Sequence, residues 1–226
     1  MILSVSDIVA ASKSMRALIV EPSPDSSTRP VLLFLHGKGE SSQDTNELPK
    51  VLFHLSPPFR ALAGELRNVT VVAPQAPRDR DDGWNWREYV QAIGTFMKTA
   101  YGDRRILAVG FSRGGLGVLQ LMSAHPGLVT QWAIVDPQRA EDETEQQKIT
   151  PEEIDRARGW LRFGNQIEKN TPFSRHIASV LPPGNSQFVD LKHVELAQQA
   201  FSGNPLNGDV DLYGFLGLTF ARLHSI

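Results

Sequence analysis

A serine set between two glycines is the feature of this chain that most clearly predicts chemistry. Gly110-Phe111-Ser112-Arg113-Gly114 has the form G-x-S-x-G, in which a serine lies on a sharp turn between a strand and a helix. Flanking side chains would clash on such a strained turn, and the serine hydroxyl stands exposed above the strand end. The following helix directs its N-terminus at developing negative charge. We therefore expect Ser112 to be a nucleophile that attacks carbonyl carbon atoms.

A serine nucleophile needs a general base, and the order of residues along the chain favours His193. Where a serine lies on a turn of this kind, the acid and then the histidine follow it in sequence. His193 comes directly after the last apolar run of the chain. The other histidines precede Ser112, end or lie within predicted helices, or lie near the C-terminus: His36, His54, His125, His176 and His224. We expect His193 to accept the proton of the serine hydroxyl.

The carboxylate that should orient the histidine has two candidates. It usually follows the penultimate strand, and in the segment after that strand, residues 164–172, Glu168 is the only carboxylate. Glu is accepted in this role, so Glu168 is the favoured acid. Asp136, at the end of the preceding apolar run, is the alternative, although an Asp before a proline also forms turns.

Two backbone amides are expected to bind the oxyanion that forms during attack on a carbonyl group. One is the amide of Arg113, directly after the nucleophile. The other should come from the loop after an earlier central strand, and residues 36–39 (HGKG) form such a loop. We assign the second donor to Lys38 and expect Gly37 to lie against the substrate, because glycine lets the backbone approach closely. The histidine of this loop is expected to brace it.

Apolar runs alternating with helical patterns are expected to position these residues. Continuous apolar runs are typical of strands that are buried on both faces. The predicted strands are Met15–Glu21, Val31–Leu35, Thr70–Ala73, Arg105–Val109, Gln131–Val135, Gly159–Phe163 and Gln187–Leu191. The predicted helices are Trp86–Tyr101, about Gly115 to Ala124, and Leu212–His224. This alternation predicts the α/β class, with a mostly parallel central sheet flanked by helices.

One polar, acidic segment, residues 137–158, departs from that alternation. Thr150-Pro151-Glu152-Glu153 within it is a good helix start, with a cap, a proline at the first position and an acidic residue at the third. A solvated surface helix is the favoured interpretation. A small lid over the site is the alternative.

Composition limits the classes of function. The 226 residues, 41% of them hydrophobic, fit one globular domain over 1–226. The absence of cysteine excludes disulfides, thiolate metal sites and a cysteine nucleophile. A net charge of −2 gives no field that would favour nucleic acid or an anionic membrane. With no secretory signal and no apolar run near the roughly 18 residues of a membrane span, we expect a cytoplasmic protein.

Five motifs together resemble the phospholipase/carboxylesterase and dienelactone-hydrolase-like branch of the α/β-hydrolases, over about residues 31–201. They are HGKGE at 36–40, SPP at 56–58, VVAPQAP at 71–77, DGWNW at 82–86 and GFSRGG at 110–115. The resemblance implies an α/β-hydrolase fold that cleaves small-molecule carboxylic esters or thioesters, with no metal and no cofactor. It also implies that Trp84 and Trp86 lie near the pocket, where they would line an acyl or aryl site; the equal alternative is that at least one of them is an ordinary core residue.

The resemblance bears on the acid as well. Family members usually carry an Asp three residues after the glycine of the acid loop and four before a proline. Here the third residue is Ile167, while Glu168 keeps the four-residue spacing to Pro172. A peptidase or acyltransferase with the same triad, and a non-catalytic ligand-binding protein on this fold, remain alternatives.

Overall fold

Within the described part of the chain, eight strands form one mixed sheet, in the order β1-β2-β4-β3-β5-β6-β7-β8. The computed structural model describes residues 1–9, 14–22, 28–42, 44–53, 55–77, 86–138, 158–164, 171–204 and 210–221. The strands are β1 Ile2–Val9, β2 Ser14–Glu21, β3 Val31–Leu35, β4 Thr70–Gln75, β5 Ile106–Phe111, β6 Gln131–Val135, β7 Arg158–Phe163 and β8 Ser186–Phe188. The pairs β1/β2 and β2/β4 are antiparallel, and every other pair is parallel. The predicted mostly parallel α/β sheet is therefore confirmed.

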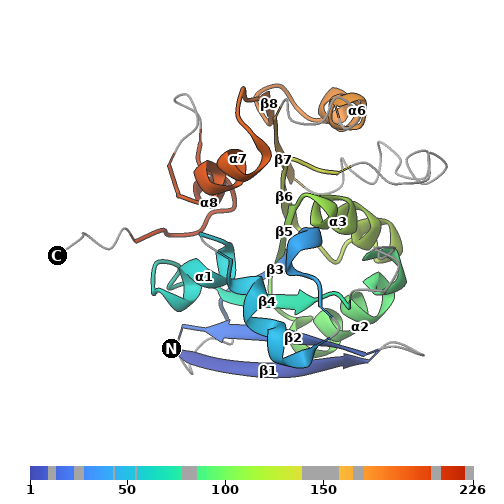
Figure 1. Cartoon of the computed structure of the whole chain (residues 1–226), viewed down its shortest axis with the longest axis vertical. Helices are drawn as coiled ribbons and strands as arrows, with labels where there is room; N and C mark the ends of the chain where they lie inside the picture. Colours follow the sequence, from blue (N-terminus) through green and yellow to red (C-terminus); the bar gives the residue numbers. More distant parts are fainter. Residues whose placement is uncertain are drawn as a thin grey trace.

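Helices cover both faces of this sheet, as Figure 1 shows. On one face lie α1 Pro57–Leu62, α7 His193–Ala200 and α8 Leu212–Phe215, and on the other lie α2 Val90–Tyr101, α3 Arg113–Ala124 and α6 Thr171–Val180. Three short 3-10 helices are η1 Lys38–Glu40, η2 Thr45–Leu52 and η3 Trp86–Glu88. Two separate apolar clusters fill the space between the sheet and its two helical layers.

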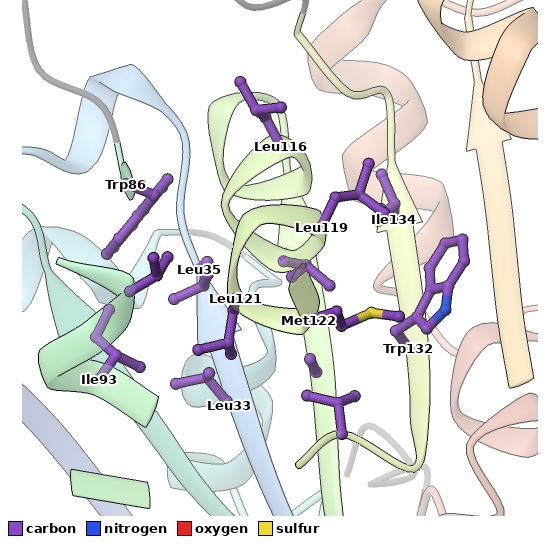
Figure 2. Packing of buried hydrophobic residues seen from close by; sticks show 14 of the residues in the cluster. Leu33, Leu35, Trp86, Ile93, Leu116, Leu119, Leu121, Met122, Trp132 and Ile134 are labelled. Atoms are coloured by element: carbon purple, nitrogen blue, oxygen red, sulfur yellow. The ribbon is translucent and has the colours of Figure 1, made fainter. Parts of the chain in front are cut away.

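The helix α3 runs through the middle of one of these clusters. Figure 2 shows Trp86 and Ile93 on one side of α3, and Trp132 and Ile134 on the other. The strand β5, which leads into α3, is buried along its whole length. A strand and a helix held this firmly fix the turn that joins them.

Two of the differences from the sequence predictions have a clear local cause. Strand β1 was missed, because it lacks the continuous apolar run of the buried strands and most of it is exposed at the sheet edge. The helix predicted over Leu212–His224 is wrong beyond Phe215. Gly217 takes a φ of 67°, which stops the helix, and Phe220 instead forms a bridge to Leu66.

The segment predicted as a surface helix or lid, residues 137–158, falls almost entirely outside the described residues, which resume at Arg158. Among the helices that the structure does describe, none combines the length and apolar character of a membrane-spanning segment.

Candidate active site

Ser112 lies on a strained turn between β5 and α3. Its φ of 55° and ψ of −123° are unusual for a residue with a side chain. Three backbone hydrogen bonds hold the turn: the Ser112 amide donates to Val135 O (3.0 Å), and Ser112 O accepts from the amides of Gly115 (3.0 Å) and Gln138 (3.1 Å). The turn is therefore tied to β6 as well as to its own helix.

Close backbone approach explains the two glycines of the motif. A Cβ on Gly110 would lie 2.4 Å from Gly114 O, and a Cβ on Gly114 would lie 1.8 Å from Leu35 O and 2.7 Å from His36 O. The first turn of α3 is thus packed against the end of β3. This packing brings the N-terminus of α3 next to the loop that follows β3.

His193, the first residue of α7, is paired with Asp136. Its Nδ1 lies 2.5 Å from Asp136 Oδ2, while Asp136 Oδ1 accepts the Gly164 amide at 2.9 Å. Because an ionised carboxylate only accepts hydrogen bonds, Nδ1 must carry the proton, which leaves Nε2 as the acceptor. Asp136 also has a positive φ, 45°. Backbone strain thus occurs at both Asp136 and Ser112, as is common at functional sites.

The structure therefore gives His193 the carboxylate that the sequence analysis placed second. Glu168, the favoured candidate, lies outside the described residues. Sheet order, which only the folded structure shows, separates the two candidates: Asp136 directly follows β6, and β6 lies beside β5, the strand that leads to Ser112. The loop after β7 begins one strand farther from the serine.

Phe111 connects the histidine to the serine turn. Phe111 is the last residue of β5 and directly precedes Ser112, and its ring stacks on the His193 imidazole with centroids 4.5 Å apart and an angle of 26°. The imidazole therefore lies at the same edge of the sheet as the serine.

The loop after β3 also reaches this edge. A Cβ on Gly37 would lie 3.1 Å from Ser112 Cβ, and Lys38 begins η1 directly after it. His36 holds the loop in place, since its Nδ1 donates to Gly37 O (2.6 Å) and its Nε2 accepts the Ala76 amide (3.0 Å). Burial lowers the pKa of His36 to about 4, so the ring is neutral at physiological pH.

Sequence comparison with protein-family models gives no match, and neither does comparison with curated proteins. Solved structures match over most of this chain. A thermostable esterase matches with a TM-score of 0.55 and 16% identity, over 83% of this chain and 54% of the esterase. A CIB-like hydrolase from Thermoplasma acidophilum matches with a TM-score of 0.55 and 19% identity, over 84% of this chain and 87% of the hydrolase. A thioesterase domain from the curacin biosynthetic pathway matches with a TM-score of 0.58 and 13% identity, over 89% of this chain and 98% of the thioesterase domain.

This chain has the α/β-hydrolase fold. It spans about half the length of the thermostable esterase and most of the length of the other two proteins. In this α/β-hydrolase fold, the ends of β3, β5 and β6 and the start of α7 bring Ser112, Asp136, His193 and the loop at 36–39 to one edge of the sheet.

Trp86 does not have the place expected of it. Its side chain is 1% exposed within the core, where a Cβ on Gly117 would lie 2.5 Å from its ring. The indole Nε1 donates to His36 O at 3.2 Å. This burial contradicts a role in lining a substrate pocket and makes Trp86 a support for the loop after β3. Trp84 lies outside the described residues.

Glu40, at the end of η1, is a further carboxyl group at this edge that the sequence analysis did not single out. Its Oε2 is buried without a hydrogen-bond partner among the described residues and lies 3.9 Å from His36 Nδ1. Burial raises the pKa of the Glu40 carboxyl, while nearby backbone amides and the His193 ring act in the opposite direction.

The described residues contain no cluster of His, Asp or Glu side chains placed to hold a metal ion.

Proposed function

We propose that this chain is a serine hydrolase that cleaves small-molecule carboxylic esters or thioesters through an acyl-enzyme. The observation that carries the proposal is the Asp136–His193 pair, which Phe111 holds against the strained turn of Ser112. The structural neighbours include an esterase and a thioesterase domain, which supports the same class of reaction.

In the first half of this reaction, His193 Nε2 takes the proton from Ser112 Oγ as the oxygen attacks the carbonyl carbon. Asp136 stabilises the imidazolium that results. The Lys38 and Arg113 amides are proposed to bind the oxyanion of the tetrahedral intermediate. The imidazolium then protonates the departing alcohol or thiol, which leaves an ester between the acyl group and Ser112.

In the second half, His193 removes a proton from water, and the resulting hydroxide attacks the acyl-enzyme carbonyl. The same two amides bind the second oxyanion. Return of the proton from His193 to Ser112 Oγ releases the carboxylic acid and restores the resting site. Each step thus uses only side chains and amides near this edge of the sheet.

A fluorophosphonate probe followed by intact-mass measurement tests the proposal. The folded protein is expected to gain the mass of one phosphonyl group, because the activated Ser112 hydroxyl attacks phosphorus and displaces fluoride. Ser112→Ala is the matched control and should gain none. A folded wild-type protein that stays unlabelled, or a Ser112→Ala variant labelled to the same extent, would contradict the proposal.

Replacing Gly37 by Ala is expected to lower kcat/KM for an aryl ester by about ten- to a hundredfold, with little change in stability. The φ of −83° at Gly37 is open to alanine, so the new methyl group acts through its contacts with Ser112 Cβ (3.1 Å), Glu40 Oε2 (3.4 Å) and Phe111 Cδ1 (3.5 Å). Small displacements of a reacting group lower reaction rates by factors of this size. Ester hydrolysis and thermal unfolding measure the two effects.

Gly39→Ala is the matched control for that variant, because a Cβ on Gly39 meets nothing within 4 Å. Its rate should stay within about twofold of wild type, as expected for a substitution without new contacts. If kcat/KM fell equally in the two variants, the loss would come from any added methyl group in the loop. The close approach of Gly37 to Ser112 would then not be its cause.

A further inference from the structure

Phe111 contacts the candidate base more closely than its place in the motif requires. The G-x-S-x-G pattern leaves this position open, yet here the ring is 6% exposed and stacks on the His193 imidazole at 4.5 Å. A Cβ on Gly37 would lie 3.5 Å from Phe111 Cδ1. One side chain therefore touches the base, borders the loop after β3 and directly precedes the serine.

The other side of Phe111 is held by an aromatic cluster. Its ring centroid lies 5.8 Å from that of Phe53 and 6.2 Å from that of Phe201, which directly follows α7. Phe201 in turn packs edge-on against Phe34 of β3 at 5.9 Å. The helix that begins with His193 is thus bound to this cluster at both of its ends, and the ring of Phe111 has little room to move.

The Asp136 hydrogen bond alone does not fix the plane of the imidazole. It holds Nδ1 at one point, but the ring could still tilt about that point and carry Nε2 away from the serine. An aromatic ring stacked on the imidazole removes this freedom. The face of a phenyl ring also carries negative charge density, which attracts a cation lying over it.

We propose that Phe111 is a positioning residue for the base, whose ring fixes the plane of the His193 imidazole and stabilises the imidazolium formed on proton transfer. This inference rests on the proposed serine hydrolase function. In the reaction, the proton passes from Ser112 Oγ to His193 Nε2, and the stacked phenyl ring lowers the free energy of the protonated state without itself exchanging a proton.

Other groups also act on the charge of His193. The Asp136 carboxylate faces it from the end of β6 and the Glu40 carboxyl from η1, with the Ser112 hydroxyl at the turn. On α7 itself, the Glu195 carboxylate accepts the Lys192 amide at 3.2 Å. None of these groups changes when Phe111 is replaced, so a difference between variants at Phe111 reports the ring.

The test compares Phe111→Leu with Phe53→Leu. Phe53 belongs to the same aromatic cluster but packs at a tilt against Phe111 rather than on the imidazole, so its loss reproduces the packing defect alone. For an aryl ester, Phe111→Leu is expected to lower kcat about tenfold with KM within twofold. The acidic limb of the plot of kcat/KM against pH should move to lower pH by about half a unit. This shift corresponds to an about threefold loss of proton affinity at the base of the free enzyme.

The direction of that shift is the discriminating result. Loss of the ring face disfavours the imidazolium and lowers the apparent pKa, whereas mere opening of the site to water favours the imidazolium and raises it. The acidic limb of the Phe53→Leu profile should coincide with that of wild type. Phe111→Tyr, which retains the ring face, should restore most of kcat. The inference would be overturned if the acidic limb of Phe111→Leu stayed in place or moved to higher pH. It would also be overturned if Phe53→Leu lost as much kcat as Phe111→Leu.

Labelling by the fluorophosphonate probe separates this inference from the function on which it rests. A wild-type protein that is not labelled contradicts both. A labelled wild-type protein, with a Phe111→Leu variant that is labelled and turns over at the wild-type rate, contradicts only the role of Phe111.

Discussion

Replacing Asp136 by Asn is expected to lower kcat for an aryl ester by about 10⁴-fold, or about 5 kcal/mol of transition-state stabilisation. The Asn oxygen would still accept the Gly164 amide, as Asp136 Oδ1 does now. Its NH₂ group would then face His193 Nδ1 and force that atom to accept. The proton of the neutral ring would move to Nε2, which could no longer take the proton of Ser112.

Glu168→Gln is the matched variant, because Glu168 was the acid that the sequence favoured. Its kcat should stay within a few-fold of wild type, as expected for a residue that does not orient the base. Steady-state kinetics together with thermal unfolding of both variants measure the difference. A 10⁴-fold loss at Glu168 with near-normal rates at Asp136 would reverse the assignment of the acid.

Replacing Gly114 by Ala is expected to destabilise the protein by about 3 kcal/mol or more, the upper range for overpacking in a core. The new methyl carbon would lie 1.8 Å from Leu35 O and 2.7 Å from His36 O. Both are backbone atoms, so no side chain can rotate to make room, and α3 must move away from β3. For a chain of this size the midpoint of thermal unfolding should fall by about 6 to 12 °C.

The catalytic effect of that variant is expected to exceed what unfolding explains. Movement of α3 displaces its first amide from the loop after β3, so kcat/KM of the folded fraction should fall as well. Gly39→Ala again supplies the control, since its methyl group meets nothing. An unfolding midpoint for Gly114→Ala within 1 °C of wild type would contradict the close packing described between α3 and β3.

The strands that position the site could be predicted because they are buried on both faces. The apolar runs of β3 and β5 are fully buried, and that of β6 is nearly so. Such runs are visible in a sequence without knowledge of what packs against them. The edge strand β1 has no such signal, and the apolar residues after Phe215 are buried by contacts with distant parts of the chain rather than by one helical face.

The places of Ser112 and His193 at one edge of the sheet could be predicted for a related reason. The glycines around Ser112 report a local backbone requirement, and the place of His193 follows from chain order. The acid could not be located in the same way, because both candidates follow a strand. Which of them reaches the histidine depends on which strand lies beside β5, and strand order is a property of the assembled sheet. The burial of Trp86 in the core could not be decided from the sequence, because a tryptophan in a motif and a tryptophan in a core look alike there.

The position of Asp136 at the end of β6 has a consequence for engineering. With the acid carried by β6, residues 165–170 have no catalytic duty in the proposed reaction. A library randomised over that segment would then leave the triad chemistry of the proposed reaction untouched. In an enzyme that carries its acid on the corresponding segment, the same library would consist mostly of inactive members.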